Sequence, residues 1–273
     1  MSVIKEVINN KLYLSDIKGL NHLDQIPELS HILTLTSAPI NTSTLPQNIT
    51  HKFLETHDVE EERLLDKFPE IIDFYEKSDC LLIHCQQGVS RSVAAVSAII
   101  MKIKELSQQQ TFEHLNTLNI QTDKVIDGFI VQLKLFEKLE FQVNRTHPDY
   151  RFWRFSILNL GYNSGGLSYN DILWSSVSDK TESKIIYRCS KCRQRLFKKS
   201  HLVIEDVSNY FLHPVDWMRD MIIDCGQTGK LLCPKCSQKL GHFSWYGECN
   251  VSTGEWLCPV FNISSKKVDK INM

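Results

Sequence analysis

The sequence predicts an α/β domain, with a mostly parallel central sheet flanked by helices, followed by a small cysteine-rich domain. Strand-like segments come first along the chain, and amphipathic helical segments follow them. An apolar strand over 81–83 leads through a glycine-containing loop into an apolar helical segment over 93–101. Seven of the nine cysteines lie from Cys189 onward, so the two parts of the chain differ chemically.

The composition is that of an ordinary globular protein. With 273 residues, 42% hydrophobic and 23% charged, the chain can form one large or two smaller domains. No apolar run is long enough to span a membrane and no signal-peptide pattern is present, so we expect a reducing, intracellular environment in which cysteines act as thiolates and ligands. Residues 1–145 carry 14 Lys and Arg against 20 Asp and Glu (−6), and residues 146–273 carry 17 against 12 (+5). The net charge of −1 therefore conceals an acidic half and a basic half.

The elements of the first domain are predicted from hydrophobic periodicity. Strands are expected over 11–16, 30–36, 50–55 and 81–83, with a short helix over 22–29 and a loop over 41–47. The acids Glu60, Glu61 and Glu62 should open the next helix, because negative charge in a first turn favours the helix dipole. Pro69 should bend or divide that helix. Further helices are expected over 93–101, 111–118 and 125–140.

A cysteine and an arginine frame the loop between the 81–83 strand and the 93–101 helix. Such a loop directs backbone N–H groups and the positive end of the helix toward one point, which makes an anion site. Cys85 at its mouth should be a thiolate, and Arg91 can hold a phosphate through two hydrogen bonds. This combination is suited to attack on a phosphate ester. The alternative is a buried strand-end cysteine and an ordinary helix-start arginine, since Cys-x5-Arg also arises by chance.

The run His-Cys-Gln-Gln-Gly-Val-Ser-Arg-Ser, from His84 to Ser92, resembles the signature of the dual-specificity protein phosphatases. Gln87 departs from the family, which usually carries a small residue there. Further matches extend the resemblance over roughly residues 1–142: they are Leu12-Tyr13-Leu14, Gly128-Phe129 and Gln132-Leu133. An RNA 5′-triphosphatase is a less favoured alternative, because those enzymes tend to carry Arg-Thr-Gly where this chain has Arg91-Ser92.

The resemblance implies the cysteine-phosphatase fold and hydrolysis of phosphoserine, phosphothreonine or phosphotyrosine through a cysteinyl-phosphate on Cys85. Ser92 would help to discharge that intermediate. His84 is expected to support the loop by hydrogen bonding, and Cys80 to be a buried strand cysteine or, less simply, a redox partner of Cys85. The phosphate would be bound by Gln86, Gln87, Gly88, Val89, Ser90 and Arg91.

Asp58 is the candidate general acid. Expelling an alcohol or phenol from phosphate requires a group that protonates the leaving oxygen, carried on a mobile loop opposite the thiolate. Asp58 follows the 50–55 strand and lies 27 residues before Cys85. The residues alone favour a helix-capping or solvated loop aspartate, whereas the resemblance implies the catalytic role.

Two Cys-x2-Cys pairs mark the last part of the chain. They are Cys189 with Cys192 and Cys233 with Cys236, separated by 40 residues. Four thiolates in a reducing compartment suit a tetrahedral structural zinc ion, and a redox role is the alternative. A second zinc site is left open; its candidate ligands are Cys225, Cys249, Cys258, His201, His213 and His242.

The expected organisation is a catalytic domain over 1–143, a linker over 144–185 and a zinc-binding domain over 186–273. The start of the linker, around Trp153, should hold a short packed segment, and glycine, serine and asparagine follow it.

The second half resembles the zinc-binding, dual specificity protein phosphatase 12-like branch of the family. The matching runs are those around the two cysteine pairs, the segment 211–218 and the segment 241–247. That branch carries a further cysteine where this chain has Val207. The resemblance implies a place in the nucleus and cytoplasm and an engagement of the zinc domain with pre-ribosomal large subunits.

The residues themselves give this binding role limited support. A run of cations without an acid could meet phosphate backbones or could merely be a solvated face. It consists of Arg188, Lys191, Arg193, Arg195, Lys198 and Lys199. Two functions are therefore kept: a protein phosphatase with a ribosome-binding zinc domain, and a ribosome-assembly factor for which the phosphatase activity is dispensable.

Overall fold

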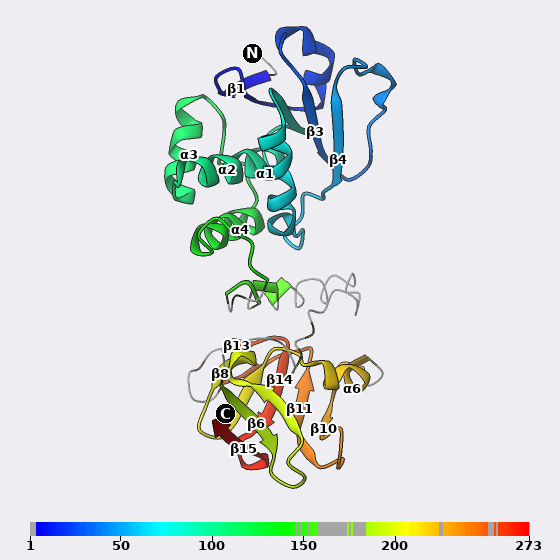
Figure 1. Ribbon diagram of the computed structural model, residues 1–273, viewed down its shortest axis with the longest axis vertical. Helices are drawn as coiled ribbons and strands as arrows, with labels where there is room; N and C mark the ends of the chain where they lie inside the picture. The colour runs from blue at the N-terminus through cyan, green and yellow to red at the C-terminus, as the bar shows by residue number, and fades with distance from the viewer. Residues whose placement is uncertain are drawn as a thin grey trace. The chain divides into compact units, whose positions relative to one another are not determined.

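The computed structural model of the chain describes residues 4–145, 184–223, 226–250 and 256–272, together with residues 147, 149–151, 153, 154, 156, 157, 174, 176 and 254. The chain divides into two compact units, Met1–Asn144 and Arg145–Met273 (Figure 1). Each unit has its own sheets and its own buried core. Among the described residues, no helix combines the length and the apolar character that crossing a membrane requires.

A five-stranded sheet forms the centre of the first unit. Its strands are β1 (Ile4–Ile8), β2 (Leu12–Ser15), β3 (His31–Thr36), β4 (Thr50–Glu55) and β5 (Leu81–Cys85). They lie in the order β1-β2-β5-β3-β4; the β1–β2 pair is antiparallel and the other three pairs are parallel. Every residue of β5 is buried, as expected of a central strand covered on both faces. The predicted α/β class with a mostly parallel sheet is confirmed, although β1 was not predicted.

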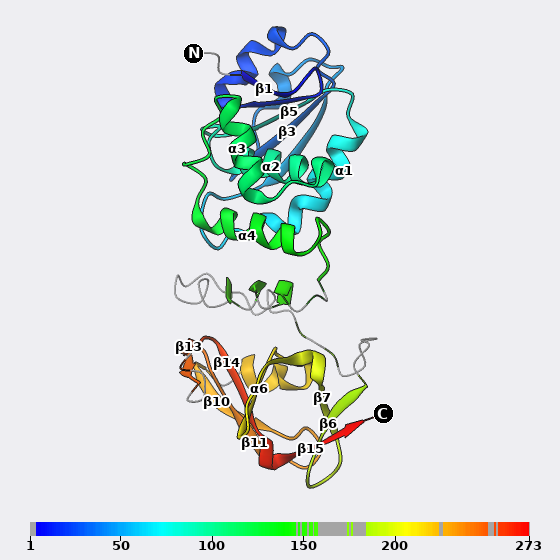
Figure 2. The same ribbon diagram turned by 90° about the vertical axis from the view of Figure 1, so that its left-hand side faces the viewer.

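Helices α1 to α4 cover one face of this sheet (Figure 2). They are α1 (Phe68–Lys77), α2 (Arg91–Lys104), α3 (Gln108–Thr117) and α4 (Asp127–Lys138). The central helix α2 is buried from Arg91 through Met101 and contacts the other three helices and β5. A separate apolar cluster packs Ile26 and Leu29 against Ile32 and Leu82 of the sheet. Helix α2 is therefore held by the other three helices and by β5, and the separate cluster packs at the 3-10 segment and the sheet.

The predicted helix starting at Glu60 is wrong. Residues 59–62 form a turn, a 3-10 helix η3 (Leu64–Lys67) follows, and α1 begins only at Phe68 with Pro69 in its first turn. Proline suits that position because the first N–H groups of a helix have no intrahelical partner. The carboxylates of Glu60 and Glu62 bind other parts of the unit, so they do not cap a helix of their own.

The other short elements of the first unit are 3-10 turns. The predicted helix over 22–29 is replaced by η1 (Ile17–Gln25). Asp16 caps its start, because the Asp16 carboxylate accepts hydrogen bonds from the N–H groups of Lys18 and Gly19. Within the predicted loop over 41–47 lies one turn, η2 (Thr42–Thr44). Both differences arise from local capping of these turns, which cannot be predicted from the spacing of apolar residues.

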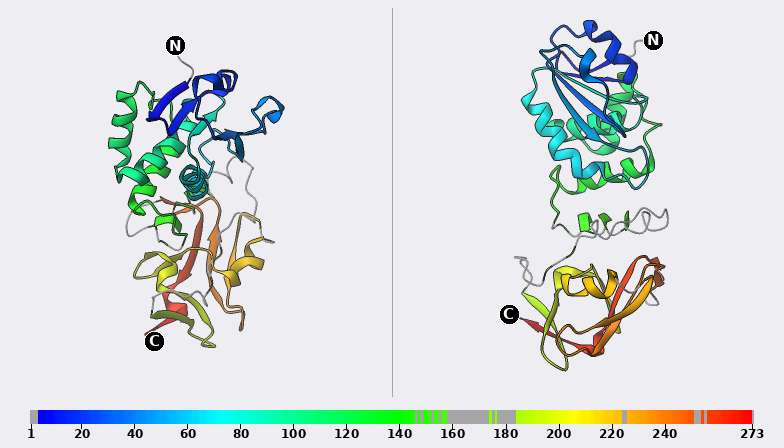
Figure 3. Two further views of the ribbon diagram at one scale, coloured as in Figure 1. Left: turned by 45° about the horizontal axis from the view of Figure 1, so that its top comes forward. Right: turned by 90° about the vertical axis from the view of Figure 1, so that its right-hand side faces the viewer.

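The second unit is built mainly of antiparallel strands (Figure 3). They form sheets of the orders β10-β11-β14-β9-β8, β15-β6-β7 and β12-β13. The strands are β6 (Ile185–Cys189), β7 (Arg195–Lys198), β8 (Leu202–Glu205), β9 (Asn209–Leu212), β10 (Thr228–Leu232), β11 (Lys239–Ser244), β12 (Glu248–Cys249), β13 (Trp256–Leu257), β14 (Val260–Ser264) and β15 (Val268–Asn272). Short helical segments join them: η5 (Lys199–His201), η6 (Asp216–Met218), α6 (Arg219–Ile223) and η7 (Ser265–Lys267).

An aromatic core holds the second unit together. Tyr187 stacks on Phe197 with ring centroids 4.5 Å apart, and Trp245 meets Phe261 edge-on at 5.9 Å. All four side chains are almost fully buried. Such rings bury large apolar areas, which a unit with few long helices needs for stability.

The predicted linker over 144–185 begins with packed residues. Tyr150 and Trp153 are buried, and their ring centroids lie 5.4 Å apart. Trp174 packs against the core of the second unit, where Arg219 lies over its ring. Most of the remaining linker residues lie outside the described part of the chain.

Candidate active site and metal centre

The loop between β5 and α2 surrounds the sulfur of Cys85. Cys85 ends β5, is 1% exposed, and accepts a 3.2 Å hydrogen bond from the N–H of Gly88. Its Sγ lies 3.1 Å from Oγ of Ser92 in the first turn of α2. A backbone N–H, a hydroxyl and the positive end of α2 therefore converge on this sulfur, and all three favour negative charge there.

Gly88 lets this loop close against the end of β2. Its φ is +69°, a conformation that side chains disfavour. A Cβ atom at this position would lie 2.7 Å from the backbone N of Asp16 and 2.9 Å from the carbonyl oxygen of Ser15. The glycine is thus required both for the turn and for the close packing of the loop on β2.

Arg91 and Asp58 meet above the loop. The guanidinium of Arg91, 7% exposed, donates a 3.0 Å hydrogen bond to the carbonyl of Thr56, and its Nε lies 3.8 Å from Oδ2 of Asp58. The hydroxyl of Ser90 donates to Oδ1 of Asp58 at 2.6 Å. The Asp58 side chain remains 35% exposed, so it can reach a bound molecule. The structure thus brings Cys85, Arg91, Asp58 and Ser92 to one place.

His84 lies behind the loop with its side chain fully buried. Its Nε2 is 2.7 Å from Oγ1 of Thr34 on the neighbouring strand β3. Burial lowers the pKa of His84 to about 4, so the ring is neutral at neutral pH. This environment agrees with the predicted role in supporting the loop.

Cys80 lies at the opposite end of β5 from Cys85. Five residues along an extended strand span about 16 Å, whereas the Cα atoms of a disulfide lie within roughly 7 Å of each other. Burial also raises the pKa of the Cys80 thiol, which disfavours its reactive form. Cys80 is therefore a buried cysteine immediately before β5 and not within it as predicted, and the redox-partner alternative is excluded for this arrangement.

Residues 12–139 match the family model described as the dual specificity phosphatase catalytic domain. This segment contains every residue of the site described above. The chain carries a dual specificity phosphatase catalytic domain. The predicted resemblance and the enzyme class are thereby confirmed.

Relatives of this phosphatase match over most of the chain. Dual specificity protein phosphatase 12 of Rattus norvegicus is 29% identical over 95% of this chain and 86% of its own length. Tyrosine-protein phosphatase yvh1 of Schizosaccharomyces pombe is 26% identical over 97% of this chain and 84% of its own. The solved phosphatase domain of Yvh1 from Chaetomium thermophilum is 19% identical, covers 52% of this chain and 99% of that chain, and superposes with a TM-score of 0.46.

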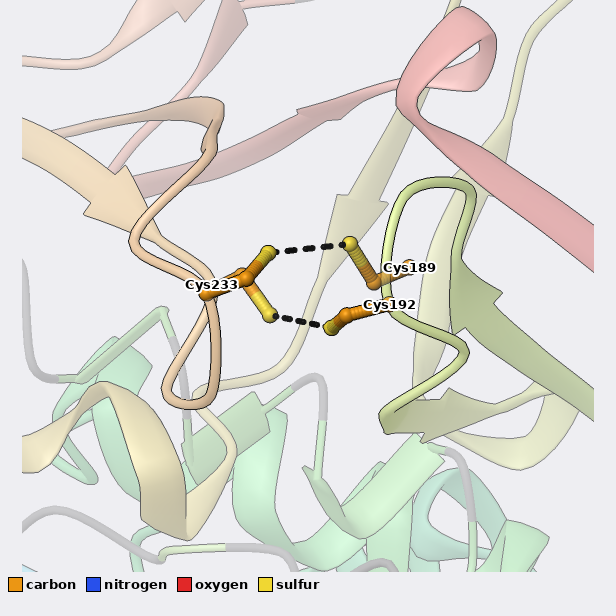
Figure 4. Close-up of side chains that lie close together, drawn as sticks. Cys189, Cys192 and Cys233 are labelled. Carbon is orange, nitrogen blue, oxygen red and sulfur yellow. Dashed lines mark hydrogen bonds between the residues drawn. The ribbon is translucent and has the colours of Figure 1, made fainter.

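Four cysteines outside the phosphatase domain form one cluster in the second unit (Figure 4). Their ligand atoms all lie within 4.8 Å of one another; the four are Cys189, Cys192, Cys233 and Cys236. The Sγ atoms of Cys189 and Cys236 are 3.7 Å apart, and those of Cys192 and Cys233 are 3.5 Å apart. Sulfurs bound at about 2.3 Å around a tetrahedral zinc ion would be roughly 3.8 Å apart. The cluster could therefore hold a metal ion, and its size fits zinc.

The two cysteine pairs have the same backbone design. The N–H of Cys189 donates to the carbonyl of Gln194, and that of Cys233 donates to the carbonyl of Gln238, at 2.8 and 2.9 Å. Each second cysteine is followed by a residue with positive φ, Arg193 in one turn and Ser237 in the other. The sequence predicted the cysteines, but it did not predict these matching turns.

The pKa values of the cluster differ between its members. A backbone hydrogen bond lowers the pKa of Cys192 to about 7, and burial raises the pKa of Cys233 to about 12. A buried thiolate needs a nearby cation, which a bound metal ion would supply.

The candidate ligands of a second metal site lie in other environments. Among the described residues, the four-cysteine cluster is the one group that could hold a metal ion. The thiol of Cys258 donates to the carbonyl of Trp245 at 3.1 Å, Cys249 is exposed, and His242 pairs with Glu248 at 2.7 Å. His201 and His213 are buried, and Cys225 lies outside the described residues.

Proposed function

We propose that this chain is a protein phosphatase that hydrolyses phosphoserine, phosphothreonine and phosphotyrosine through a cysteinyl-phosphate on Cys85. The observation that carries the proposal is that a buried cysteine sulfur, an arginine and an exposed aspartate lie together at the loop between β5 and α2. Cys85 Sγ has the Gly88 N–H and the Ser92 hydroxyl beside it, and Arg91 is fixed at the loop's end.

The first chemical step forms an S–P bond. The Cys85 thiolate attacks phosphorus, and the loop N–H groups with the Arg91 guanidinium stabilise the charge on the phosphoryl oxygens. The bond from phosphorus to the ester oxygen breaks, and protonated Asp58 gives its proton to that oxygen, so the product leaves as a neutral alcohol or phenol.

The second step returns the enzyme to its starting state. A water molecule attacks the phosphoryl group, and the Asp58 carboxylate takes its proton. The S–P bond breaks and the electron pair returns to Cys85. The Ser92 hydroxyl, 3.1 Å from the sulfur, donates to the departing thiolate and makes it a better leaving group.

Asp58 is the acid that best fits this scheme, because it contacts the loop after β5 whereas Glu60 and Glu62 bind elsewhere. Glu60 binds the N–H of Gly128, and Glu62 binds both the N–H of His57 and the Lys67 ammonium, each at 2.7 Å. Asp58 is the carboxylate held against Ser90 of the phosphate loop.

The test compares two cysteine variants of the full chain. Cys85→Ser should lose nearly all turnover of an aryl phosphate and of phosphopeptides, because a serine hydroxyl is a poor nucleophile at this site. Cys80→Ser is the control: it changes a buried cysteine at the other end of β5 and should keep substantial activity. Turnover by Cys85→Ser comparable with that of Cys80→Ser would contradict the mechanism.

For the second unit we propose a structural zinc ion and a role in binding pre-ribosomal large subunits, in the nucleus and the cytoplasm. The sulfur separations support zinc. Exposed cations support the binding role, because Lys191 and Lys235 each lie inside a Cys-x2-Cys turn and can approach phosphate backbones. Of the predicted basic run, Lys198 is buried and Arg193 pairs with Asp269, so those two contribute less.

Cosedimentation with purified large-subunit precursor particles tests this role. The double variant Lys191→Glu with Lys235→Glu should lose cosedimentation, whereas Lys5→Glu with Lys18→Glu, an equal charge change in the first unit, should not. Equal cosedimentation of both variants would overturn the proposal. Cys85→Ser distinguishes the alternative function: if particles mature normally with it, the phosphatase activity is dispensable for assembly.

A further inference from the structure

The loop that carries Asp58 is attached to the start of α4 at two points. On one side, the carboxylate of Glu60 accepts a hydrogen bond from the N–H of Gly128 in the first turn of α4. On the other side, the side chain of Gln132 donates to the carbonyl of Glu62 at 2.8 Å. Asp58 lies only two residues from the first of these contacts, so its position depends on α4.

Both the oxygen and the nitrogen of the Gln132 carboxamide form hydrogen bonds within this attachment. It is 0% exposed, its Oε1 accepts from the N–H of Leu65 at 2.7 Å, and its Nε2 also donates to the carbonyl of Gly128 at 3.0 Å. A buried amide with three such bonds has one orientation, because any rotation leaves donors or acceptors unpaired. Gln132 therefore fixes the loop end and the helix start to each other.

Gly128 makes the attachment through Glu60 sterically possible. A Cβ atom at this position would lie 2.7 Å from both the carbonyl oxygen and the Oε2 of Glu60. The N–H of Gly128 is one of the first N–H groups of α4, which lack intrahelical partners and attract negative charge. Glu60 satisfies this donor and is drawn to the positive end of the helix.

We propose that the first turns of α4 are a positioning element for Asp58, acting through the Glu60–Gly128 contact and the Gln132 carboxamide. The inference rests on the proposed role of Asp58 as general acid. With both attachments made, the Asp58 carboxylate accepts a 2.6 Å hydrogen bond from the hydroxyl of Ser90. A general acid that is positioned in advance loses less conformational freedom in the transition state. The loop that carries Asp58 was predicted to be mobile, but the two attachments anchor it to α4.

The central test removes the exposed attachment. Glu60→Ala should lower turnover of a substrate with a poor leaving group, such as a phosphoserine peptide, by roughly tenfold, a part of the 10²–10⁴-fold that a general acid contributes. Turnover of an activated aryl phosphate, whose leaving group needs no proton, should change less than twofold. Glu61→Ala is the matched control, since the adjacent Glu61 makes neither attachment, and Glu60→Gln should restore part of the activity because its amide oxygen can still accept from Gly128.

Two further variants separate positioning from stability. Gly128→Ala should displace the Glu60 backbone from α4, because the methyl group would lie 2.7 Å from the Glu60 carbonyl oxygen, and should show the same selective loss on poor leaving groups; the melting temperature, measured beside the kinetics, reports the cost in stability. Gln132→Glu keeps the volume and the acceptor but loses the bonds donated to Glu62 and Gly128, and should show the same selective loss together with a lower melting temperature, because a buried carboxylate then faces two unpaired carbonyls. In an Asp58→Asn background, Glu60→Ala should have no further effect.

The outcomes distinguish this inference from the proposed function. If Asp58→Asn shows the leaving-group selectivity while Glu60→Ala and Gly128→Ala match the wild type, the positioning role is wrong and the general acid stands. Equal losses on both substrates in Glu60→Ala would also overturn it, because they would indicate a general structural defect. If Asp58→Asn itself shows no selectivity, the proposed role of Asp58 is what fails.

Discussion

The hydroxyl of Ser90 and the carboxylate of Asp58 are joined by a 2.6 Å hydrogen bond across a sequence separation of 32 residues. Ser90 ends the phosphate loop, and Asp58 lies on the loop after β4. The bond places the proposed acid against the loop that would hold the phosphate. Arg91 adds a second contact to the loop that carries Asp58, because its guanidinium donates a hydrogen bond to the carbonyl of Thr56. The loop between β5 and α2 and the loop that carries Asp58 are therefore bound directly to each other.

A first prediction concerns the chemistry of Asp58. Asp58→Asn keeps the size and the Ser90 contact but cannot donate a proton as readily. Turnover of phosphoserine peptides should fall by about 10²-fold or more, and turnover of an activated aryl phosphate should fall far less. Steady-state kinetics on both substrates measures this difference. Equal losses on the two substrates, or none, would point to Asp66 or to one of the acids Glu60, Glu61 and Glu62.

The arginine at the loop's end gives a second prediction. Arg91→Lys keeps the charge but loses the planar pair of donors and the bond to the Thr56 carbonyl. Turnover should fall nearly to background, and inhibition by vanadate, a phosphate-like anion, should weaken in parallel. Lys102→Arg, a change in the last turn of the same helix, serves as the control and should leave both measurements unchanged. Wild-type vanadate inhibition of Arg91→Lys would show that the guanidinium does not hold the anion.

Gly88 provides a third prediction. Gly88→Ala places a methyl group 2.7 Å from the backbone of Asp16 and strains a left-handed residue. Backbone atoms cannot yield as a flexible side chain can, so the loop should shift and turnover should fall by more than tenfold. Gly254 lies in the second unit and also has positive φ, but a Cβ there would have no atom of the described residues within 4 Å; it is the control position, and Gly254→Ala should keep full activity. Similar turnover in both variants would contradict the packing argument.

Much of the phosphatase unit could be predicted from its sequence because its central elements carry strong periodic signals. The buried strand ending at Cys85 and the apolar helix after Arg91 were found this way, and the loop between them followed from its glycine. The grouping of the four clustered cysteines could be predicted equally well, since each Cys-x2-Cys pair has its own spacing signal.

The remainder depended on contacts that are distant in sequence. Glu60 belongs to an acidic run that is typical of a helix start, but its carboxylate binds the N–H of Gly128, 68 residues away. No local pattern reports such partners, so the helix was predicted too early. The anchoring role of Gln132 was missed for the same reason: its partners lie 67 and 70 residues away.

A fourth prediction uses the buried ring of His84. Its pKa is about 4 in the folded chain against about 6.5 when unfolded, so the unfolded state binds the proton between these values. The stability of the first unit should therefore be full above pH 6.5 and fall as the pH drops toward 4, by about 3 kcal/mol at most. His84→Gln should be less stable at pH 7 but should flatten this dependence. Urea unfolding of the full chain, followed by far-UV circular dichroism of helices α1 to α4, measures it, and an unchanged slope in His84→Gln would contradict the assignment.

The last prediction concerns the metal and the independence of the two units. Four thiolates should hold one zinc ion, whose binding free energy, roughly 10–16 kcal/mol in small zinc domains, is largely folding free energy. All five tryptophans lie in the second unit, so their fluorescence reports its unfolding, while helical circular dichroism reports mainly the first. Cys233→Ser, or a chelator, should therefore abolish the fluorescence transition and leave the helical signal and the phosphatase turnover nearly unchanged.

The control for this experiment is Cys249→Ser, which replaces an exposed cysteine outside the cluster. Metal analysis of the purified chain should give about one zinc ion per chain for the wild type and for Cys249→Ser, and none for Cys233→Ser. A chain without zinc, or a loss of turnover in Cys233→Ser, would contradict the prediction. About two ions per chain, falling to one in Cys249→Ser, would instead show that a second site exists and that Cys249 is one of its ligands. This follows because a serine hydroxyl binds the ion too weakly to replace a thiolate ligand.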